Sequence, residues 1–321
     1  MHTRAWRGAE VIASDFPLAE VSDHLEHDDE IVWVDLCAPD ADDVHRLAAE
    51  LSLHELAVED ALSDHQRPKL DRYATHLFVT GHAIWWKEGE KFHATEIDCF
   101  VGPHWLITVR KNERFDVQQL IDRWDQSSEM LEHGVSFLLY AVLDVVVDGY
   151  FECINAFDDY YDHVSEGLFA DKPLEPKEQR DWFETRQDLV KFHRLVAPMR
   201  EVVSGLMRRE QGSVQEPLYP YYQDLYDHVL RVVESTDALR DLVATIVETN
   251  LSLRDYRQNQ IMKKVTSWAA IIAVPTLVTG YYGMNVPYPG FARHWGVYTS
   301  TIVMLVVVVG LYWSFKRRDW L

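Results

Sequence analysis

The sequence predicts an α+β membrane protein: an N-terminal α/β domain, then long stalk helices, then two transmembrane helices at the C-terminal end. Three observations predict this order. Segments rich in β-branched and aromatic residues, which favour strands, lie within residues 1–115. The long stretches that follow contain almost no Gly or Pro and repeat apolar residues at helical spacing. Two uncharged apolar segments then stand near the end of the chain.

The first 115 residues combine strand and helix signals. Gly and Pro separate the candidate segments, as they do between the elements of a compact domain. Mixed strands and helices favour an α/β domain over a purely helical one. The expected strands are 31–36, 76–86, 95–101 and 105–109, and a helix is expected at 41–51.

Cysteine usage and the N-terminus both predict a cytosolic location for this domain. Cys37, Cys99 and Cys153 lie far apart without a CxxC pair, which excludes a disulfide framework and a thiolate zinc ribbon. The first 17 residues contain no apolar core of the signal-peptide kind. The histidines of this region lack metal-site spacing, so no zinc site is expected among His76, His82, His93 and His104.

The charge of the chain is divided unevenly. Its formal net charge is −21, from 31 basic and 52 acidic residues. Residues 263–321 contain six basic residues and one acidic residue, whereas residues 1–262 contain 25 basic and 51 acidic residues. An acidic surface repels phosphate backbones, so we expect no nucleic acid partner. The same surface attracts cations.

The middle of the chain is predicted to be helical. A helical hairpin region is expected over 116–220, with helices at 136–168 and 176–209, the second interrupted at Pro198. Pro173 and Pro176 mark the turn between them, and 211–220 is the next turn. Residues 221–274 contain neither Gly nor Pro. As one helix they would span roughly 80 Å, so we assign 221–285 to a stalk helix that enters the membrane at about residues 266–284.

Two segments, 268–284 and 297–315, are uncharged, and each approaches the ~20 apolar residues that cross a bilayer. Their flanks favour a membrane over the alternative of two buried core helices. Lys263 and Lys264 precede the first segment and a basic tail, 316–321, follows the second, while the loop 286–296 has only Arg293. Positive flanks favour the cytosolic side, so both termini of this multi-pass chain are expected in the cytosol.

The long helix carries two stripes of residues. The first is typical of a coiled-coil seam or of packing against the chain's own helices. It comprises Leu225, Val229, Val232, Thr236, Leu239, Val243, Ile246, Asn250 and Leu253. The second changes from acidic to polar to small residues, and a ring of identical helices would place it along a central cation pathway. It comprises Glu248, Leu251, Asp255, Asn259, Met262, Thr266, Ala269, Ala273, Thr276, Gly280 and Gly283.

The first apolar segment ends in Tyr282-Gly283-Met284-Asn285. Gly lets backbones approach closely, and Asn offers a neutral oxygen able to bind the water shell of an ion. Mg²⁺ dehydrates reluctantly and prefers oxygen ligands, so a neutral amide ring would hold the hydrated ion without trapping it. The position of this motif, at the end of the first of two C-terminal apolar segments, makes it more specific than the tripeptide alone.

At these residues the chain resembles the CorA family of divalent-cation channels, the GMN-motif metal ion transporters. Tyr282 to Asn285 matches the family signature YGMN, and Pro275-Thr276 matches a proline and threonine before it. Asn259 and Met262 match the family's pore asparagine and a following hydrophobic position. Residues 59–62 and 65–69 match the N-terminal signature EDxL…HQRPK, and the tail KRRDWL resembles the family's basic end.

The resemblance implies a homopentamer in the cell (inner or plasma) membrane, in contact with lipid, that passes Mg²⁺ inward. Co²⁺ and Ni²⁺ are alternative ions. Gly283, Met284 and Asn285 would form the selectivity filter, and Thr276, Met262 and Asn259 would line the path. Carboxylates of one subunit would face a neighbour's long helix at a regulatory Mg²⁺ site formed by Glu59, Asp60, Asp224, Asp227 and His228. Asp224, Asp227 and His228 share one helix face, and a solvated charged face is the alternative.

Two departures from the family pattern affect these expectations. The outer loop lacks the acidic residue that relatives often carry, and Ala273 replaces a bulky apolar residue of some relatives. A zinc or other transition-metal transporter of the same superfamily, with proton coupling, is the alternative function, although Met284 favours Mg²⁺. An enzyme built on Asp158 and Asp159 is disfavoured, because no nucleophile elbow, phosphate loop or HExxH motif is present.

Overall fold

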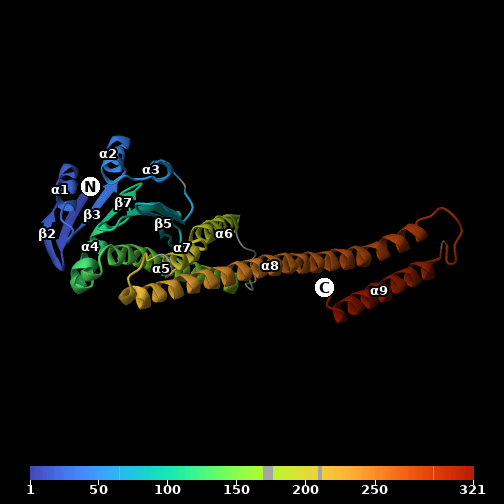
Figure 1. Cartoon of the computed structure of the whole chain (residues 1–321). Helices are drawn as coiled ribbons and strands as arrows, with labels where there is room; N and C mark the ends of the chain where they lie inside the picture. The colour runs from blue at the N-terminus through green and yellow to red at the C-terminus, as the bar shows by residue number, and fades with distance from the viewer. Residues whose placement is uncertain (65, 169–175, 209–211, 292) are drawn as a thin grey trace. The chain divides into compact units, whose positions relative to one another are not determined.

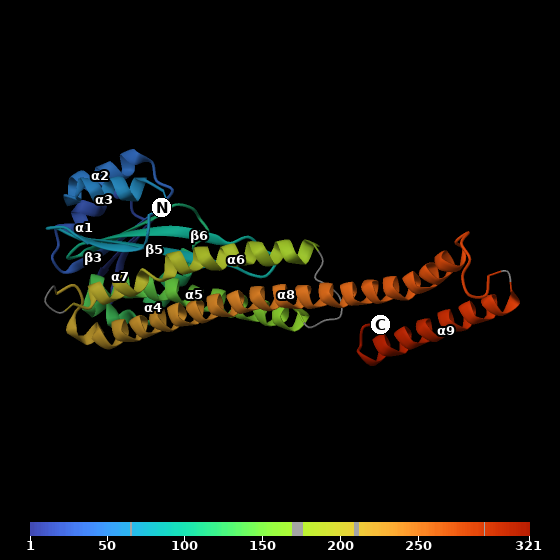
Figure 2. The same cartoon turned by 90° about the vertical axis from the view of Figure 1, so that its right-hand side faces the viewer.

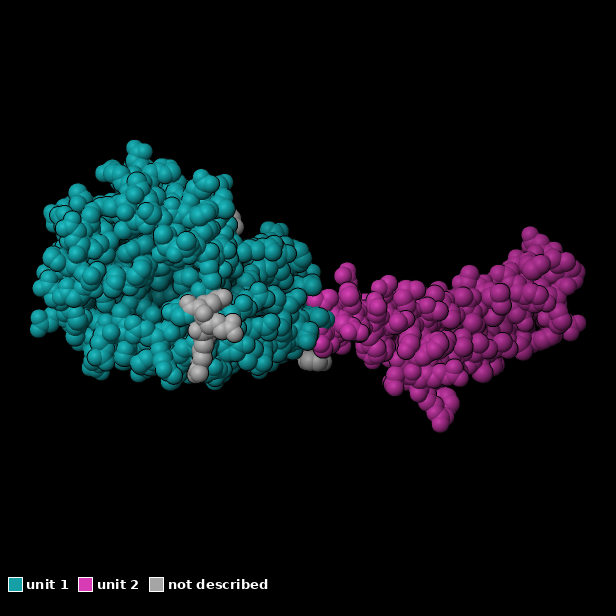
Figure 3. Space-filling model, in the orientation of Figure 1, with its two compact units in different colours: residues 1–244 teal, residues 245–321 magenta. Residues whose placement is uncertain are grey.

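The computed structural model describes residues 1–321 apart from 65, 169–175, 209–211 and 292. It divides into two compact units, Met1–Ala244 and Thr245–Leu321, which are coloured separately in Figure 3. Unit 1 contains all seven strands of one sheet and most of the helices. Unit 2 contains the second part of the long helix α8 and the helix α9.

The sheet has the order β2-β1-β3-β7-β6-β5-β4. Only β3 and β7 pair in parallel, and the other neighbours are antiparallel. The strands are β1 His2–Arg7, β2 Glu10–Ser14, β3 Glu30–Cys37, β4 Lys69–Arg72, β5 Leu77–Trp85, β6 His93–Val101 and β7 Trp105–Arg110. The four expected strands are therefore confirmed as β3, β5, β6 and β7.

The sequence did not predict β1, β2 and β4. β2 and β4 are the two edge strands of the sheet, and β1 lies next to β2. β2 has no buried residue, and β4 consists of Lys69, Leu70, Asp71 and Arg72. Their charged or short sequences lack the run of β-branched residues that marks a central strand.

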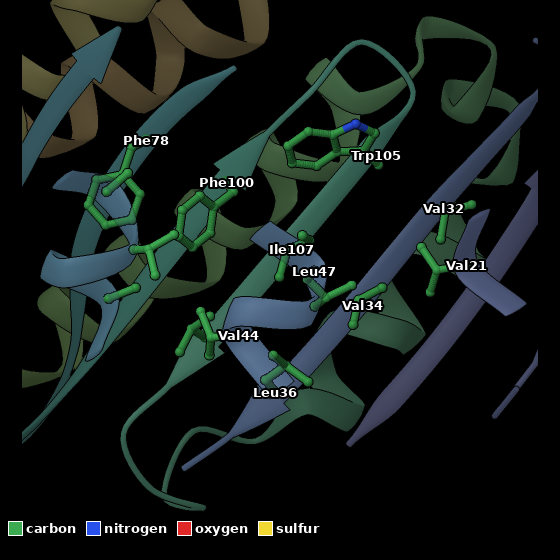
Figure 4. Packing of buried hydrophobic residues seen from close by; sticks show 14 of the residues in the cluster. Val21, Val32, Val34, Leu36, Val44, Leu47, Phe78, Phe100, Trp105 and Ile107 are labelled. Carbon is green, nitrogen blue, oxygen red and sulfur yellow. The ribbon is translucent and has the colours of Figure 1, made fainter. Parts of the chain in front are cut away.

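Short helices cover one face of the sheet (Figures 1 and 2). They are α1 Val21–Leu25, α2 Ala41–Leu51 and α3 Glu55–Leu62. The helix expected at 41–51 is confirmed. Val44 and Leu47 of α2 lie over Val34 and Ile107 of the sheet, and all four side chains are at most 2% exposed (Figure 4). This apolar core fixes α2 and α3 on the sheet, because apolar area removed from water stabilises by about 25 cal/mol per Å².

The opposite face of the sheet is covered by α4 Val117–Gln126 and by the much longer helix α5 Val135–Leu168 (Figure 1). Trp124 of α4 packs edge-on against Trp33 and Trp6, with ring centroids 4.7 and 5.6 Å apart. The hydroxyl of Tyr150 on α5 donates a 2.9 Å hydrogen bond to the His82 carbonyl of β5. The helical hairpin is thus attached to the sheet by both apolar and polar contacts.

The predicted helices of the middle region are confirmed at α5, α6 Pro176–Val196 and α7 Met199–Leu206. The interruption falls at Pro198, which lies just before α7. Pro176 begins α6, whereas Pro173 lies outside the described residues. The turn expected at 211–220, whose first residue lies outside the described residues, ends earlier than predicted, because α8, Tyr219–Tyr282, begins two residues before the predicted stalk.

In unit 1, the first stripe of α8 packs against the chain's own helices. Leu225, Val229 and Val232 are fully buried, and Leu239 and Val243 are nearly so. The Tyr222 hydroxyl donates to the Ser136 carbonyl of α5, and Asp237 lies 3.2 Å from His193 of α6. Between the two explanations of this stripe, internal packing therefore accounts for its first part.

Unit 2 has the sequence pattern of a membrane hairpin. The remainder of α8 runs beside α9, His294–Arg317, in both views (Figures 1 and 2). Both helices are long and apolar enough to cross a bilayer, with mean hydropathy 1.4 and 1.8 in their most apolar windows. Only 11% and 6% of those windows are buried, so neither helix has the environment of a soluble core helix. The expected borders between the α/β domain, the hairpin region, the stalk helix, the loop and the second membrane segment, at residues 115, 220, 285, 296 and 315, stay predictions.

Candidate functional site

The order of helix, glycine and amide at the candidate selectivity segment has a clear local cause. α8 ends at Tyr282, where the amide of Gly283 donates to the Thr279 carbonyl at 2.8 Å. The amide of Met284 then donates to the Tyr281 carbonyl at 3.3 Å, which closes the last turn. A Cβ on Gly283 would lie 3.0 Å from the Thr279 oxygen, so a side chain would crowd this turn.

The three residues of the segment are all exposed in the single chain. Met284 is 50% exposed, and Gly283 and Asn285 are also accessible. An exposed neutral amide at a helix end can accept hydrogen bonds from water molecules around an ion. Such contacts leave the ion's own ligands in place, which suits a cation that loses water slowly.

The candidate pore stripe occupies a face of α8 that the chain leaves open. Ser267 and Ile271 are buried in unit 2 on another face of α8. The stripe residues all lie at exposed positions: Glu248, Leu251, Asp255, Asn259, Met262, Thr266, Ala269, Ala273, Thr276, Gly280 and Gly283. Exposed Leu251 and Met262, at 58% and 56%, are apolar side chains without cover from their own chain. A face of this kind is typical of contact with other molecules or of a water-filled path.

Thr276 is the polar residue nearest the middle of the apolar part of this stripe. Its hydroxyl donates a 3.0 Å hydrogen bond to the Ile272 carbonyl, one helical turn earlier. The hydroxyl proton is thereby engaged, which leaves the oxygen lone pairs available as acceptors. A ring of such oxygens would present partial negative charge to a passing cation.

The first half of the candidate regulatory site lies on α3. Glu59 is exposed, while Asp60 is half-buried and accepts a 2.6 Å hydrogen bond from the Lys69 ammonium. Lys69 also lies 3.0 Å from a carboxylate oxygen of Asp71. Burial alone would lower the pKa of Lys69, but its hydrogen bonds to the two carboxylates outweigh burial and raise it. Asp60 is therefore paired with an ammonium of its own chain.

The second half lies on the first part of α8. Asp224 and Asp227 are exposed, and Asp227 accepts a 3.0 Å hydrogen bond from Gln223. The His228 ring lies edge-on to Phe151 of α5, and its Nε2 is 3.7 Å from an oxygen of Asp224. Among these described residues, no hydrogen bond or ion pair joins the α3 carboxylates to Asp224, Asp227 or His228 within one chain. The two halves are separate in the single subunit.

The sequence did not predict a polar cluster that lies next to the end of α3. The Lys111 ammonium donates to the carbonyls of Ala61 and Ser63, at the C-terminal end of α3. It also lies 3.5 Å from Glu96 and 3.9 Å from Asp98. Burial, with Glu96 nearby, raises the pKa of Asp98 to about 7 although Thr80 donates a hydrogen bond to it. The sequence of β6 contained a sign of this cluster, because Glu96 and Asp98 alternate onto the same face of the strand as the buried Phe100.

Another group of possible metal ligands lies near the start of β3. His27, Asp29 and Glu30 have ligand atoms close enough for one ion. Arg7 already contacts Asp29 at 3.1 Å and Glu30 at 2.6 Å, and His24 lies 2.7 Å from Glu30. Burial opposes ionisation of Glu30, but the hydrogen bonds from His24 and Arg7 lower its pKa. This group is therefore an internal ion-pair cluster, and we assign it no metal.

Comparison with known proteins identifies the family. Residues 28–317 match the family model described as CorA-like Mg²⁺ transporter protein. The chain is similar to the putative metal ion transporter YfjQ of Bacillus subtilis, with 27% identity over 90% of this chain and 89% of the relative. It is also similar to the cobalt/magnesium transport protein CorA of Thermotoga maritima, with 26% identity over 90% of this chain and 83% of the relative.

A solved structure shares the fold over the whole length. The CorA magnesium transporter of Methanocaldococcus jannaschii superposes with a TM-score of 0.79 and 20% identity, covering 99% of this chain and 98% of that one. The zinc transport protein ZntB of Enterobacter sp. is 23% identical over 98% of this chain and 99% of the relative. The family model places the chain in the class of membrane transporters of divalent cations. The chain belongs to the CorA-like Mg²⁺ transporter family.

Proposed function

We propose that this chain forms a homopentameric channel that admits Mg²⁺ across the plasma membrane, with Co²⁺ and Ni²⁺ as further permeant ions. The observation that carries the proposal is the placement of Gly283, Met284 and Asn285. They follow the last residue of α8 directly, and all three lie at exposed positions. The exposed acidic, polar and small-residue stripe of the same helix supports a cation path leading away from that segment.

Selection in this proposal depends on hydrogen bonds to the ion's water shell. Asn285 side chains from five copies would surround hydrated Mg²⁺ at the outer mouth. Because a neutral amide interacts with the ion more weakly than a carboxylate does, the ion is able to leave. It would then pass Thr276, Met262 and Asn259. Asp255 and Glu248, near the cytosolic end of the stripe, would attract the ion through their negative charge.

Feedback in this proposal depends on carboxylates at subunit interfaces. Glu59 and Asp60 of one subunit would face Asp224, Asp227 and His228 of its neighbour. Opposed carboxylates repel one another unless a cation lies between them. Internal Mg²⁺ bound there would stabilise the closed arrangement, and loss of the ion would shift the population toward the open one. The exposure of Glu59, Asp224 and Asp227 in the single chain supports this assignment.

The proposed orientation places both termini in the cytosol and the loop 286–296 outside. Lys316 and Arg317 lie in the last turn of α9, and Lys263 and Lys264 precede the apolar part of α8. Their ring neighbours support an interfacial position, since the Lys316 ammonium and the Arg317 guanidinium lie over Tyr312 and Trp313. Basic and aromatic residues together are typical of the membrane–water boundary on the cytosolic side.

A zinc transporter, with proton coupling, is the second candidate. The similarity to ZntB of Enterobacter sp., which extends over 98% of this chain, favours it. Met284 favours Mg²⁺, because zinc-transporting relatives in this superfamily tend to replace the methionine of the motif.

Ion uptake into liposomes tests the proposal. The purified full-length protein is reconstituted, and uptake of Mg²⁺, Co²⁺, Ni²⁺ and Zn²⁺ is measured with and without a pH gradient. The expected result is Mg²⁺ uptake that follows the ion's own gradient and does not require a proton gradient. Zinc uptake that depends on the pH gradient, in the absence of Mg²⁺ uptake, would establish the second candidate instead.

A further inference from the structure

The loop after the selectivity segment folds back onto the end of α8. The Tyr288 hydroxyl donates a 2.8 Å hydrogen bond to the carbonyl oxygen of Tyr282. Tyr282 is the last residue of α8, and its carbonyl is one of those that a helix end leaves without an intrahelical donor. The peptide unit that contains this carbonyl leads directly into Gly283. Tyr288 therefore contacts the backbone at the entrance to the candidate selectivity segment.

Ring contacts hold the Tyr288 side chain in this position. Its ring lies edge-on to that of Tyr282, at 4.9 Å between centroids and 75° between planes. Phe291 packs edge-on from the other direction at 5.3 Å, and its amide donates to the Tyr288 carbonyl at 2.9 Å. Edge-on aromatic pairs of this kind contribute about 0.5–1.5 kcal/mol each. These contacts restrict the rotamers that the Tyr288 side chain can adopt.

The local sequence stiffens the backbone on both sides of this residue. Pro287 precedes Tyr288 and Pro289 follows it. Each proline ring fixes its own φ, and a residue before proline is restricted to extended conformations. A chain with few alternative conformations loses little entropy when it forms the hydrogen bond to Tyr282.

The C-terminal part of the loop contacts the first turn of α9. A Cβ on Gly296 would lie 2.5 Å from the carbonyl oxygen of Gly290, so only glycine permits this backbone contact. Gly290 has φ +92°, a conformation that other residues rarely adopt. The amide of Arg293 donates to the same Gly290 carbonyl at 3.1 Å. Contacts thus extend from α9 through Gly290 and Tyr288 to Tyr282.

We propose that Tyr288 is a positioning residue for the selectivity segment Gly283–Asn285. Its hydroxyl fixes the Tyr282 carbonyl and thereby sets the direction in which the chain leaves α8. An amide ring recognises a hydrated ion only when its oxygens are held to within roughly 0.5 Å. Loss of the Tyr288 hydroxyl would leave the ring of Asn285 amides in place, but its oxygens would be less well ordered. This inference rests on the proposed role of Gly283–Asn285 in selecting the ion.

The test is Tyr288→Phe, which removes one oxygen atom and keeps the ring contacts. Full-length protein in liposomes is assayed for Mg²⁺ uptake over a range of Mg²⁺ concentrations. Because one neutral hydrogen bond is lost, the half-saturating Mg²⁺ concentration should rise about fivefold, while the maximal flux changes less than about twofold. Tyr298→Phe is the matched control, since Tyr298 is 69% exposed on α9, and it should leave both quantities unchanged.

Two further measurements separate positioning from folding and from failure of the proposed function. Gly296→Ala, which disturbs the seat of the loop on α9, should produce the same rise in half-saturating concentration. Amide hydrogen exchange of the peptide covering 279–290 should be about fivefold faster in Tyr288→Phe than in the unmodified protein, a readout independent of transport.

Unchanged half-saturation and unchanged exchange in Tyr288→Phe would overturn the inference. Loss of assembly, seen as a changed oligomer size in detergent, would also overturn it, because the hydroxyl would then serve folding in general. Absence of uptake of any of the four cations by the unmodified protein would instead contradict the proposed function, and the exchange result would still decide whether Tyr288 orders the segment.

Discussion

Lys69 binds Asp60 within the same chain, with Nζ 2.6 Å from the carboxylate oxygen. Asp60 is one of the residues proposed for the regulatory Mg²⁺ site, so part of the negative charge at that site is already balanced. A cation that binds at the interface would compete with this ammonium for Asp60. Among the described residues, it would have no such competitor at Glu59, which is exposed. At the proposed site, the internal pair would therefore lower the affinity for Mg²⁺.

Replacing Lys69 should make feedback more sensitive. In Lys69→Met the Asp60 carboxylate is released, so the internal Mg²⁺ concentration that halves influx should fall about fivefold, corresponding to roughly 1 kcal/mol for a partly buried ion pair. The measurement is Mg²⁺ influx into liposomes preloaded with increasing Mg²⁺. Lys87→Met, at an exposed position, is the control and should not alter inhibition. An inhibition constant unaffected by Lys69→Met would remove Asp60 from the site.

Neutralising the exposed carboxylates should have the opposite effect. The double variant Glu59→Gln with Asp224→Asn removes one negative charge from each side of the proposed interface without a large change in volume. Bridging by Mg²⁺ then gains less Coulomb energy, and closure should require about tenfold more internal Mg²⁺. The same preloaded liposomes measure this. Glu234→Gln, also exposed on α8, is the matched control. Normal inhibition in the double variant would favour a solvated surface at these positions.

The sequence predicted the parts of the fold that repeat a physical pattern. The central strands β3 and β7 are runs of buried β-branched and aromatic residues, and α8 has long stretches without Gly or Pro. Edge strands such as β4 were not predicted, because Lys69, Asp71 and Arg72 give no apolar alternation. Lys69 forms an ion pair with Asp60 of α3, and Arg72 donates hydrogen bonds to Ser213 and to the Gly205 carbonyl of α7, contacts that depend on the folded chain.

The same distinction applies to the candidate site. Gly283, Met284 and Asn285 form a contiguous motif, so their position at the end of a helix could be predicted. The pairing of Asp60 with Lys69 joins α3 to β4, and the contact of Lys111 with Ala61 and Ser63 joins the residue after β7 to the end of α3. Such contacts between distant elements leave no periodic trace in the sequence. They became visible only with the sheet register.

Asn285 should be essential for Mg²⁺ entry. Asn285→Ala removes the amide oxygen from the proposed ring and leaves no acceptor for the ion's water molecules, so Mg²⁺ influx should fall at least about 100-fold. Influx into liposomes under a fixed inward gradient measures the effect. Ser300→Ala on α9 is the control, since its hydroxyl bonds only to the nearby Val297 carbonyl. Influx in Asn285→Ala equal to that of the unmodified protein would remove the selectivity role from this residue.

The stability of unit 1 should decrease as pH rises toward 7, because of Asp98. Burial raises the pKa of this carboxyl from 3.8 to about 7, so between about pH 4 and 7 the folded state holds a proton that the unfolded state releases. The free energy of unfolding therefore falls with rising pH, by at most about 1.4 kcal/mol per pH unit for one group.

Asp98→Asn is neutral at every pH and keeps an acceptor for Thr80. Its thermal unfolding midpoint should depend less on pH and should exceed that of the unmodified protein at pH 8. Asp162→Asn, at an exposed position, should keep the original pH dependence. If Asp98→Asn unfolded at a lower temperature than the unmodified protein at pH 8, Asp98 would be stabilised as a carboxylate by Lys111 rather than as an acid.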